Sequence, residues 1–146
     1  MTPSPLDAKE VRLLMEIGMV GAGSGARLAS AVEQLFSALM VLRPAHDFPY
    51  IGQATAYFNQ ARPDDAVRVL ERGLRVLESS QASSRQDDRD MLRAFLGLAL
   101  FMGRRTAEAT QTLQHLLRTG QNPQALRMAR GLMGLPIEEA QTEEIR

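Results

Sequence analysis

The side chains best suited to hold a metal ion are two histidines and one cluster of aspartates. Neither His46 nor His115 has a second ligand at the spacing that a zinc site requires. Asp87, Asp88 and Asp90 could begin a calcium loop, but the glycine and the distal glutamate of such a loop are missing. The chain also has no cysteine, which excludes thiolate ligands and disulfides. We therefore expect no metal site.

Two further stretches have residue types found in active sites. The run from Gly21 to Gly25 reads GAGSG, but no strand is expected before it and no Lys-Ser or Lys-Thr pair follows it, so it fits a helix stop better than a phosphate loop. Four serines within residues 79–84 have no histidine or aspartate partner in a catalytic motif. The sequence thus predicts neither an enzyme nor a cofactor.

Charge and hydropathy narrow the class of protein further. The 146 residues include 17 basic and 17 acidic side chains, and this balance argues against a nucleic-acid partner, since phosphate binding needs clustered Lys and Arg. The segment 17–42 is the most apolar, but Arg27, Glu33 and Gln34 interrupt it, so we expect no membrane insertion. The start of the chain lacks a signal-peptide pattern. We expect a soluble, cytoplasmic protein with one domain.

Apolar residues recur at helical spacing along the chain, and no stretch alternates with a period of two, which predicts an all-α fold. The expected helices run from residue 6 to the glycine-rich stretch, and then over 26–42, 48–60, 64–78, 90–102, 106–118 and 123–133. They form a single domain over 6–134, with hairpins at about 6–43, 47–78 and 90–119 and a capping helix at 123–133. Residues 79–90 are expected to be a polar linker, and 1–5 and 135–146 flexible ends.

The hairpin over residues 48–77 shows the clearest repeat pattern. Ala54 and Ala66 are 12 residues apart, as are Gly97 and Ala109, and small side chains at such positions let the two helices of a hairpin approach closely. Ala31 precedes Ala66 by 35 residues, close to the 34-residue period of tetratricopeptide (TPR) repeats. These spacings predict a TPR-like helical-hairpin solenoid.

The match to the repeat is uneven. In the first unit Gly18 and Ala31 take the place of the small pair, 13 residues apart. Gln53, Arg93 and Gly21 depart from the residue types that the TPR pattern has at their positions. These departures affect the register of the units more than the fold class.

The first helix of each TPR hairpin lines an inner groove, and here the positions expected to face it are apolar and rich in methionine. Such a deformable surface suits the apolar face of a partner helix, and it lacks the cations that would bind an acidic chain end. Methionines at helical spacing can equally form core beneath the last helix or a dimer partner. The candidate groove residues are Met15, Met19, Ile51, Phe58, Met91, Leu98, Phe101 and Met102.

Residues 92–133, LRAFLGLALFMGRRTAEATQTLQHLLRTGQNPQALRMARGLM, resemble the C-terminal half of TPR-type chaperones of bacterial type III secretion. MEIGMVGAGSGARLASAVEQLFSALMVLRP, followed by YIGQATAYFNQARPDDAVRVLERGL, is similar to small TPR-like proteins of the same systems. The resemblance implies a chaperone that masks the amphipathic helix of a secreted subunit, which in one branch is the needle protein, with a small helical co-chaperone on the first helices. The alternative is a self-associating TPR adaptor or assembly protein of a secretion system, for example a homodimer.

Overall fold

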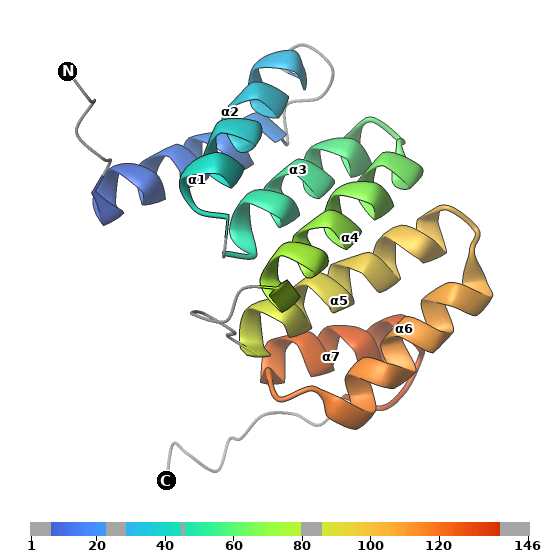
Figure 1. Ribbon diagram of the computed structural model, residues 1–146. Helices are drawn as coiled ribbons and strands as arrows, with labels where there is room; N and C mark the ends of the chain where they lie inside the picture. Colours follow the sequence, from blue (N-terminus) through green and yellow to red (C-terminus); the bar gives the residue numbers. More distant parts are fainter. Residues whose placement is uncertain (1–6, 23–28, 45, 80–85, 138–146) are drawn as a thin grey trace, which may run out of the picture.

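The computed structural model describes residues 7–22, 29–44, 46–79 and 86–137, and within these ranges it contains seven α-helices and no strand (Figure 1). This confirms the predicted all-α class. The helices are α1 (Ala8–Ala22), α2 (Ala29–Leu42), α3 (Phe48–Asn59), α4 (Pro63–Ser79), α5 (Gln86–Met102), α6 (Thr106–Thr119) and α7 (Pro123–Leu132).

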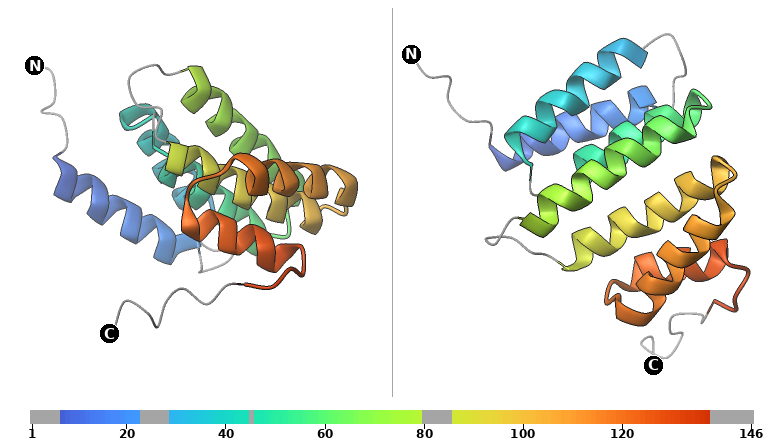
Figure 2. Two further views of the ribbon diagram at one scale, coloured as in Figure 1. Left: turned by 90° about the horizontal axis from the view of Figure 1, so that it is seen from below. Right: turned by 45° about the vertical axis from the view of Figure 1, so that its right-hand side comes forward.

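Helices that follow one another in the chain pack side by side as antiparallel neighbours, and the two further views show the same stack from α1 to α7 (Figure 2). A second set of contacts joins alternate helices, because α1 packs on α3, α3 on α5, and α5 on α7. The odd-numbered helices therefore form a continuous row along the stack.

Short-range signals set several helix ends. Asp7 and Glu10 form a capping box, in which each backbone N–H donates to the other's carboxylate at 2.8 Å. Pro63 is the first residue of α4, where its missing N–H costs nothing. Asn122 caps α7 by accepting from two backbone N–H groups, and Pro123 follows as the first helical residue.

The expected linker over residues 79–90 is wrong at its C-terminal end, because α5 begins at Gln86 and not near Asp90. Acidic side chains in the first turn, Asp87 and Asp88, stabilise this early start through the positive end of the helix dipole. The expected flexible ends at 1–5 and 138–146 lie outside the described residues, whereas residues 135–137 are described and are not helical.

Large side chains pack directly onto glycines where helices cross. The fully buried ring of Phe36, from α2, lies against Gly18 of α1 and also against Gly52 of α3, so a Cβ atom at either glycine would collide with the ring. The ring of Tyr50 packs on Gly73 in the same way, and its hydroxyl donates to the carbonyl of Pro44 at 3.0 Å. These contacts fix the crossing of α1, α2, α3 and α4.

The predicted small residues of the second and third hairpins are buried. Ala54, Ala66 and Ala109 are completely buried, and the side chain of Leu113 fills the space above Gly97. In the first hairpin Ala31 is exposed, so its predicted pairing with Gly18 is wrong. The ring of Phe36 packs on Gly18 instead, and it also packs on Gly52 of α3.

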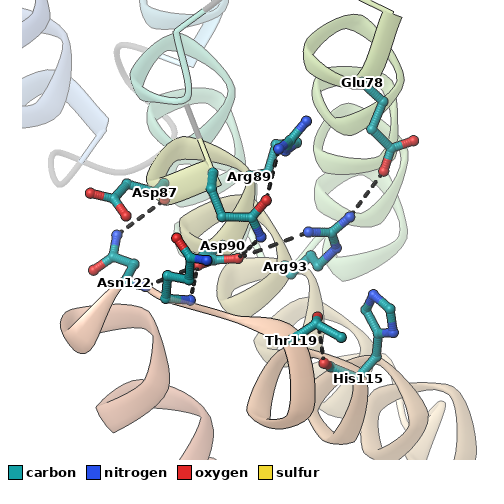
Figure 3. Close-up of polar contacts among 10 residues, drawn as sticks. Glu78, Asp87, Arg89, Asp90, Arg93, His115, Thr119 and Asn122 are labelled. Atoms are coloured by element: carbon teal, nitrogen blue, oxygen red, sulfur yellow. Dashed lines mark hydrogen bonds and ion pairs between the residues drawn. The ribbon is translucent and has the colours of Figure 1, made fainter. Parts of the chain in front are cut away.

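The buried carboxylate of Asp90 ties the α6–α7 turn to the start of α5 (Figure 3). Its Oδ2 accepts from the backbone N–H groups of Gln121 at 2.7 Å and Asn122 at 2.9 Å. Its Oδ1 accepts from the side-chain amide of Gln86 at 2.9 Å, with a guanidinium nitrogen of Arg93 at 3.9 Å. The carboxylate of Asp90 can remain buried because both of its oxygens accept hydrogen bonds.

Replacing this carboxylate should loosen the capping helix. We expect Asp90→Ala to lower the free energy of unfolding by about 2–4 kcal/mol, because two buried backbone N–H groups would lose their acceptor. Asp87→Ala, at an exposed position in the same turn, is the matched control and should cost about 0.5 kcal/mol. Urea unfolding measures both. Equal costs for the two variants would show that Asp90 does not hold the turn.

Candidate binding surfaces

One face of α5 presents a row of large apolar side chains. Met91, Phe95, Leu98 and Met102 follow one another at intervals of four, three and four residues, which places them on one side of a helix. The first three are partly buried, and Met102 is 44% exposed. We call these four residues the α5 stripe. Its side chains remain open enough to contact a partner.

A hollow of about 340 Å³ lies at the N-terminal end of the same face. Side chains from α1, α3 and α5 and from the α2–α3 turn line it, among them Val11, Met15, His46, Phe48 and Asp88. Asp88 precedes Met91 by three residues, so the hollow adjoins the α5 stripe. The α5 stripe is apolar, whereas the hollow beside it is lined by both apolar and charged residues, including Arg12 and Arg43.

Of the remaining predicted groove residues, Ile51 is buried, whereas Met15, Met19, Phe58 and Phe101 are partly buried, like the first three residues of the α5 stripe. Ile51 is only 8% exposed and belongs to the central core, with Phe58 and Phe101 packed against that core. Met19 packs against the cluster formed by α1, α2 and α3. Met91 and Phe95 of the α5 stripe pack against the same central core as Phe58 and Phe101, so packing against the core does not separate groove residues from core residues here.

A second apolar surface lies at the N-terminal end of the stack. Leu13, Ile17 and Val20 are spaced for one face of α1 and are 56%, 53% and 74% exposed. Ile17 and Val20, together with Ala31 and Leu35 of α2, line a hollow of about 260 Å³. A signal in the sequence could have revealed this surface, because α2 is apolar around most of its circumference whereas the end of a solenoid normally shows a polar outer face.

A third surface feature is polar and lies between α2, α3 and α4. Gln53 there is only 3% exposed, and its amide donates to the hydroxyl of Tyr57. That hydroxyl donates in turn to the carboxylate of Glu33 at 3.0 Å. Among the residues that the structure describes, none donates to Oε1 of Gln53. Gln53 and Tyr57 line a hollow of about 260 Å³, which we call the Gln53 hollow.

Charged groups organise the edge of the Gln53 hollow. Burial raises the pKa of Tyr57, and its bond to Glu33 acts in the same direction, so the phenol keeps its proton. The guanidinium of Arg62 lies 4.7 Å from the centre of the Tyr57 ring. Hydrogen bonds from Arg68 and then from Arg62 lower the pKa of Asp65 and keep that carboxyl ionised.

The third hairpin has an equivalent hollow of about 400 Å³ between α4, α5 and α6. Leu96 and Leu100 stand there, 43 residues after Gln53 and Tyr57. The fold therefore accepts apolar side chains at both positions. The departure of Gln53 from the repeat pattern was visible in the sequence, but its burial and its unmet oxygen were not.

The residues with metal or catalytic potential do not come together. In the described ranges no three His, Asp or Glu side chains are grouped so that they could hold a metal ion. His115 is exposed on α6 (Figure 3), and His46 lines the hollow beside α1. None of the helices described is both long and apolar enough to cross a membrane.

Comparisons of the chain with protein-family models, with curated proteins and with solved structures found no match.

Gln53 also yields a prediction about stability. Gln53→Leu should raise the free energy of unfolding by about 1 kcal/mol, because it removes a buried acceptor that has no donor and restores the residue type of the third hairpin. Gln114→Leu, at an exposed site on α6, should stay within about 0.5 kcal/mol of the unmodified chain. Thermal and urea unfolding provide the readout. A clear loss of stability in Gln53→Leu would mean that the glutamine is required for packing.

Proposed function

We propose that this chain is a TPR-like solenoid that acts as a secretion chaperone, holding the amphipathic helix of a secreted subunit against the row of odd-numbered helices. The observation that carries the proposal is the α5 stripe, where three large apolar side chains are half-buried and a fourth is exposed. A helix laid in such a groove contributes its own apolar face through residues spaced at three and four.

The helix contacts support the TPR part of the proposal. α3 and α5 each pack both on the even-numbered helix before them and on the next odd-numbered helix, which is how successive hairpins of a solenoid share one core. The buried small residues Ala54, Ala66 and Ala109 support the same assignment. α7 closes the stack, since it packs on α5 and α6 only.

The chemistry of the face supports an apolar client. None of the four side chains of the α5 stripe is charged, and two of them are methionines, whose unbranched, polarisable side chains adapt to different partner surfaces. An aggregation-prone secretion subunit, such as a needle protein, would bury its own apolar helix here and remain dispersed.

The N-terminal surface of α1 fits the co-chaperone that the resemblance implies. Leu13, Ile17 and Val20 expose more than half of their surfaces, and exposed apolar patches of this kind mark sites of protein association. The alternative function, a self-associating adaptor, would use this surface to bind a second copy. Light scattering of the lone chain separates the two, because a client-independent dimer that Ile17→Glu converts to a monomer favours the adaptor.

Replacing an apolar residue of the α5 stripe by glutamate should weaken client binding. We expect Leu98→Glu and Met102→Glu each to weaken the complex with a co-expressed needle-type subunit of the same organism at least about tenfold, because a carboxylate would be buried against an apolar helix. Both positions are accessible enough for the variants to fold.

Gln111→Glu, at an exposed position on α6, is the matched control and should bind like the unmodified chain. Light scattering coupled to size exclusion gives the stoichiometry, expected to be one client to one chaperone. A complex that survives both α5 substitutions would place the client elsewhere on the molecule.

A further inference from the structure

The hollow of the third hairpin lies on the side of α5 away from the α5 stripe. α4 and α6 both pack on α5 but, among the described helices, not on each other, so a hollow of about 400 Å³ opens between them with α5 beneath (Figure 1). We call it the Leu96 hollow. Arg93, Leu96 and Leu100 line it from α5, about half a helical turn around the helix from Leu98 and Met102. A ligand bound there is therefore independent of the proposed chaperone function.

One end of the Leu96 hollow is basic. Arg93, His115 and Arg118 line it toward the C-terminal end of α6, and Figure 3 shows the first two. Arg93 bonds Glu78 at 3.1 Å. The side chains of His115 and Arg118 are exposed, and neither bonds another side chain in the part of the chain that the structure describes. These groups can donate hydrogen bonds to a carboxylate.

The other end of the hollow is acidic, since Glu71 of α4 and Glu108 of α6 line it. Arg105 donates to the two oxygens of Glu108 at 2.9 and 2.7 Å. The bond to Glu108 and then the charge of Glu71 raise the pKa of Arg105, so both carboxylates lie near this guanidinium. Glu71 itself accepts no hydrogen bond from any described residue and can bind an ammonium group.

The helical repeat gives the distance between the two ends. Glu108 precedes His115 by seven residues on α6. On α4, Glu71 precedes Glu78, the partner of Arg93, by the same number. Seven helical residues rise about 10 Å, which is also roughly the length of three residues of extended peptide. The charges of the hollow therefore match those at the two free ends of a tripeptide.

The middle of the hollow suits the rest of such a peptide. Leu74 and Leu96, which are 9% and 8% exposed, provide an apolar floor for a side chain. Gln111 and Thr112 stand on the α6 wall, and their side chains bond no other described residue, so they can bond peptide N–H and C=O groups. The volume lies within the roughly 300–1,000 Å³ of sites that enclose small ligands.

We propose that the Leu96 hollow binds a short apolar peptide of about three residues with both ends free. Its carboxylate lies at the basic end, beside Arg118, and its amino group at the acidic end, beside Glu71.

Nuclear magnetic resonance of the intact ¹⁵N-labelled chain tests the site with the tripeptide Ala-Leu-Ala as the probe. We expect saturable shifts of the backbone amides around Leu96, Thr112 and Arg118, and none around Gln53 in the equivalent hollow of the second hairpin. Acetylation of the amino end or amidation of the carboxyl end should each weaken binding about tenfold, the effect of one lost hydrogen bond to a charged group.

Peptide length provides a second test. The peptide Ala-Ala-Leu-Ala-Ala has ends about 17 Å apart when extended, and the charges of free leucine are adjacent. Neither ligand can reach both ends of the hollow while its chain stays on the floor, so each should bind about tenfold more weakly than Ala-Leu-Ala.

Two variants identify which end of the peptide lies where. Arg118→Gln should weaken binding of Ala-Leu-Ala about tenfold without further weakening its C-terminal amide, which has no carboxylate to lose. Glu71→Gln should likewise weaken Ala-Leu-Ala but not its N-acetyl form. Both side chains are at least partly exposed, so the core is undisturbed. Arg127→Gln and Glu16→Gln, at exposed positions on α7 and α1, are matched controls and should bind like the unmodified chain.

The proposal is overturned if Ala-Leu-Ala causes no saturable shift, or if the peptide blocked at both ends binds as tightly. Unchanged binding of Ala-Leu-Ala by either Arg118→Gln or Glu71→Gln would also overturn it. Equal affinity for the tripeptide and the pentapeptide would do the same, because the distance between the charges would then play no part in binding.

Discussion

Close approach of helices at glycines is the constraint on which this structure depends. At four crossings a large side chain from one helix lies directly on a glycine of another, with Phe36 on Gly18 and on Gly52, Tyr50 on Gly73 and Leu113 on Gly97. A protein interior has almost no spare volume, so each pair fixes both the distance and the register of its helices. The row of odd-numbered helices, and with it every surface described above, follows from these contacts.

The two ends of the helix stack differ in the side chains that they expose. At the C-terminal end α7 covers α5 and α6, and the carboxylate of Asp90 fastens the turn that leads into it. At the N-terminal end α1 and α2 keep apolar side chains outward, led by Ile17 and Val20. A solenoid needs polar outer faces to stay dispersed, so an apolar end is a place for association. Among the described residues, the N-terminal end of the stack is therefore more apolar than the C-terminal end.

The sequence predicted the helices and two hairpins well because periodicity and small residues are local signals. Ala54, Ala66 and Ala109 are buried as their spacing implied. The predicted pairing of Ala31 with Gly18 was wrong, because Phe36 packs on Gly18 in the first hairpin. Spacing in the sequence does not distinguish an aromatic residue that packs on a glycine from an ordinary core residue. Ile51 and Leu98 have similar periodicity in the sequence, and only the packing of the helices decides that Ile51 is buried in the core and Leu98 is partly exposed.

Gln53 marks a difference between two equivalent positions in the second and third hairpins. The second and third hairpins have equivalent hollows, and a leucine in the third hairpin shows what stability alone would favour there. Positions where a local rule is broken without a gain in packing are where natural proteins carry functional chemistry. The hydrogen-bond chain from Glu33 through Tyr57 strengthens this interpretation, because it aligns an amide whose oxygen would otherwise be free to turn.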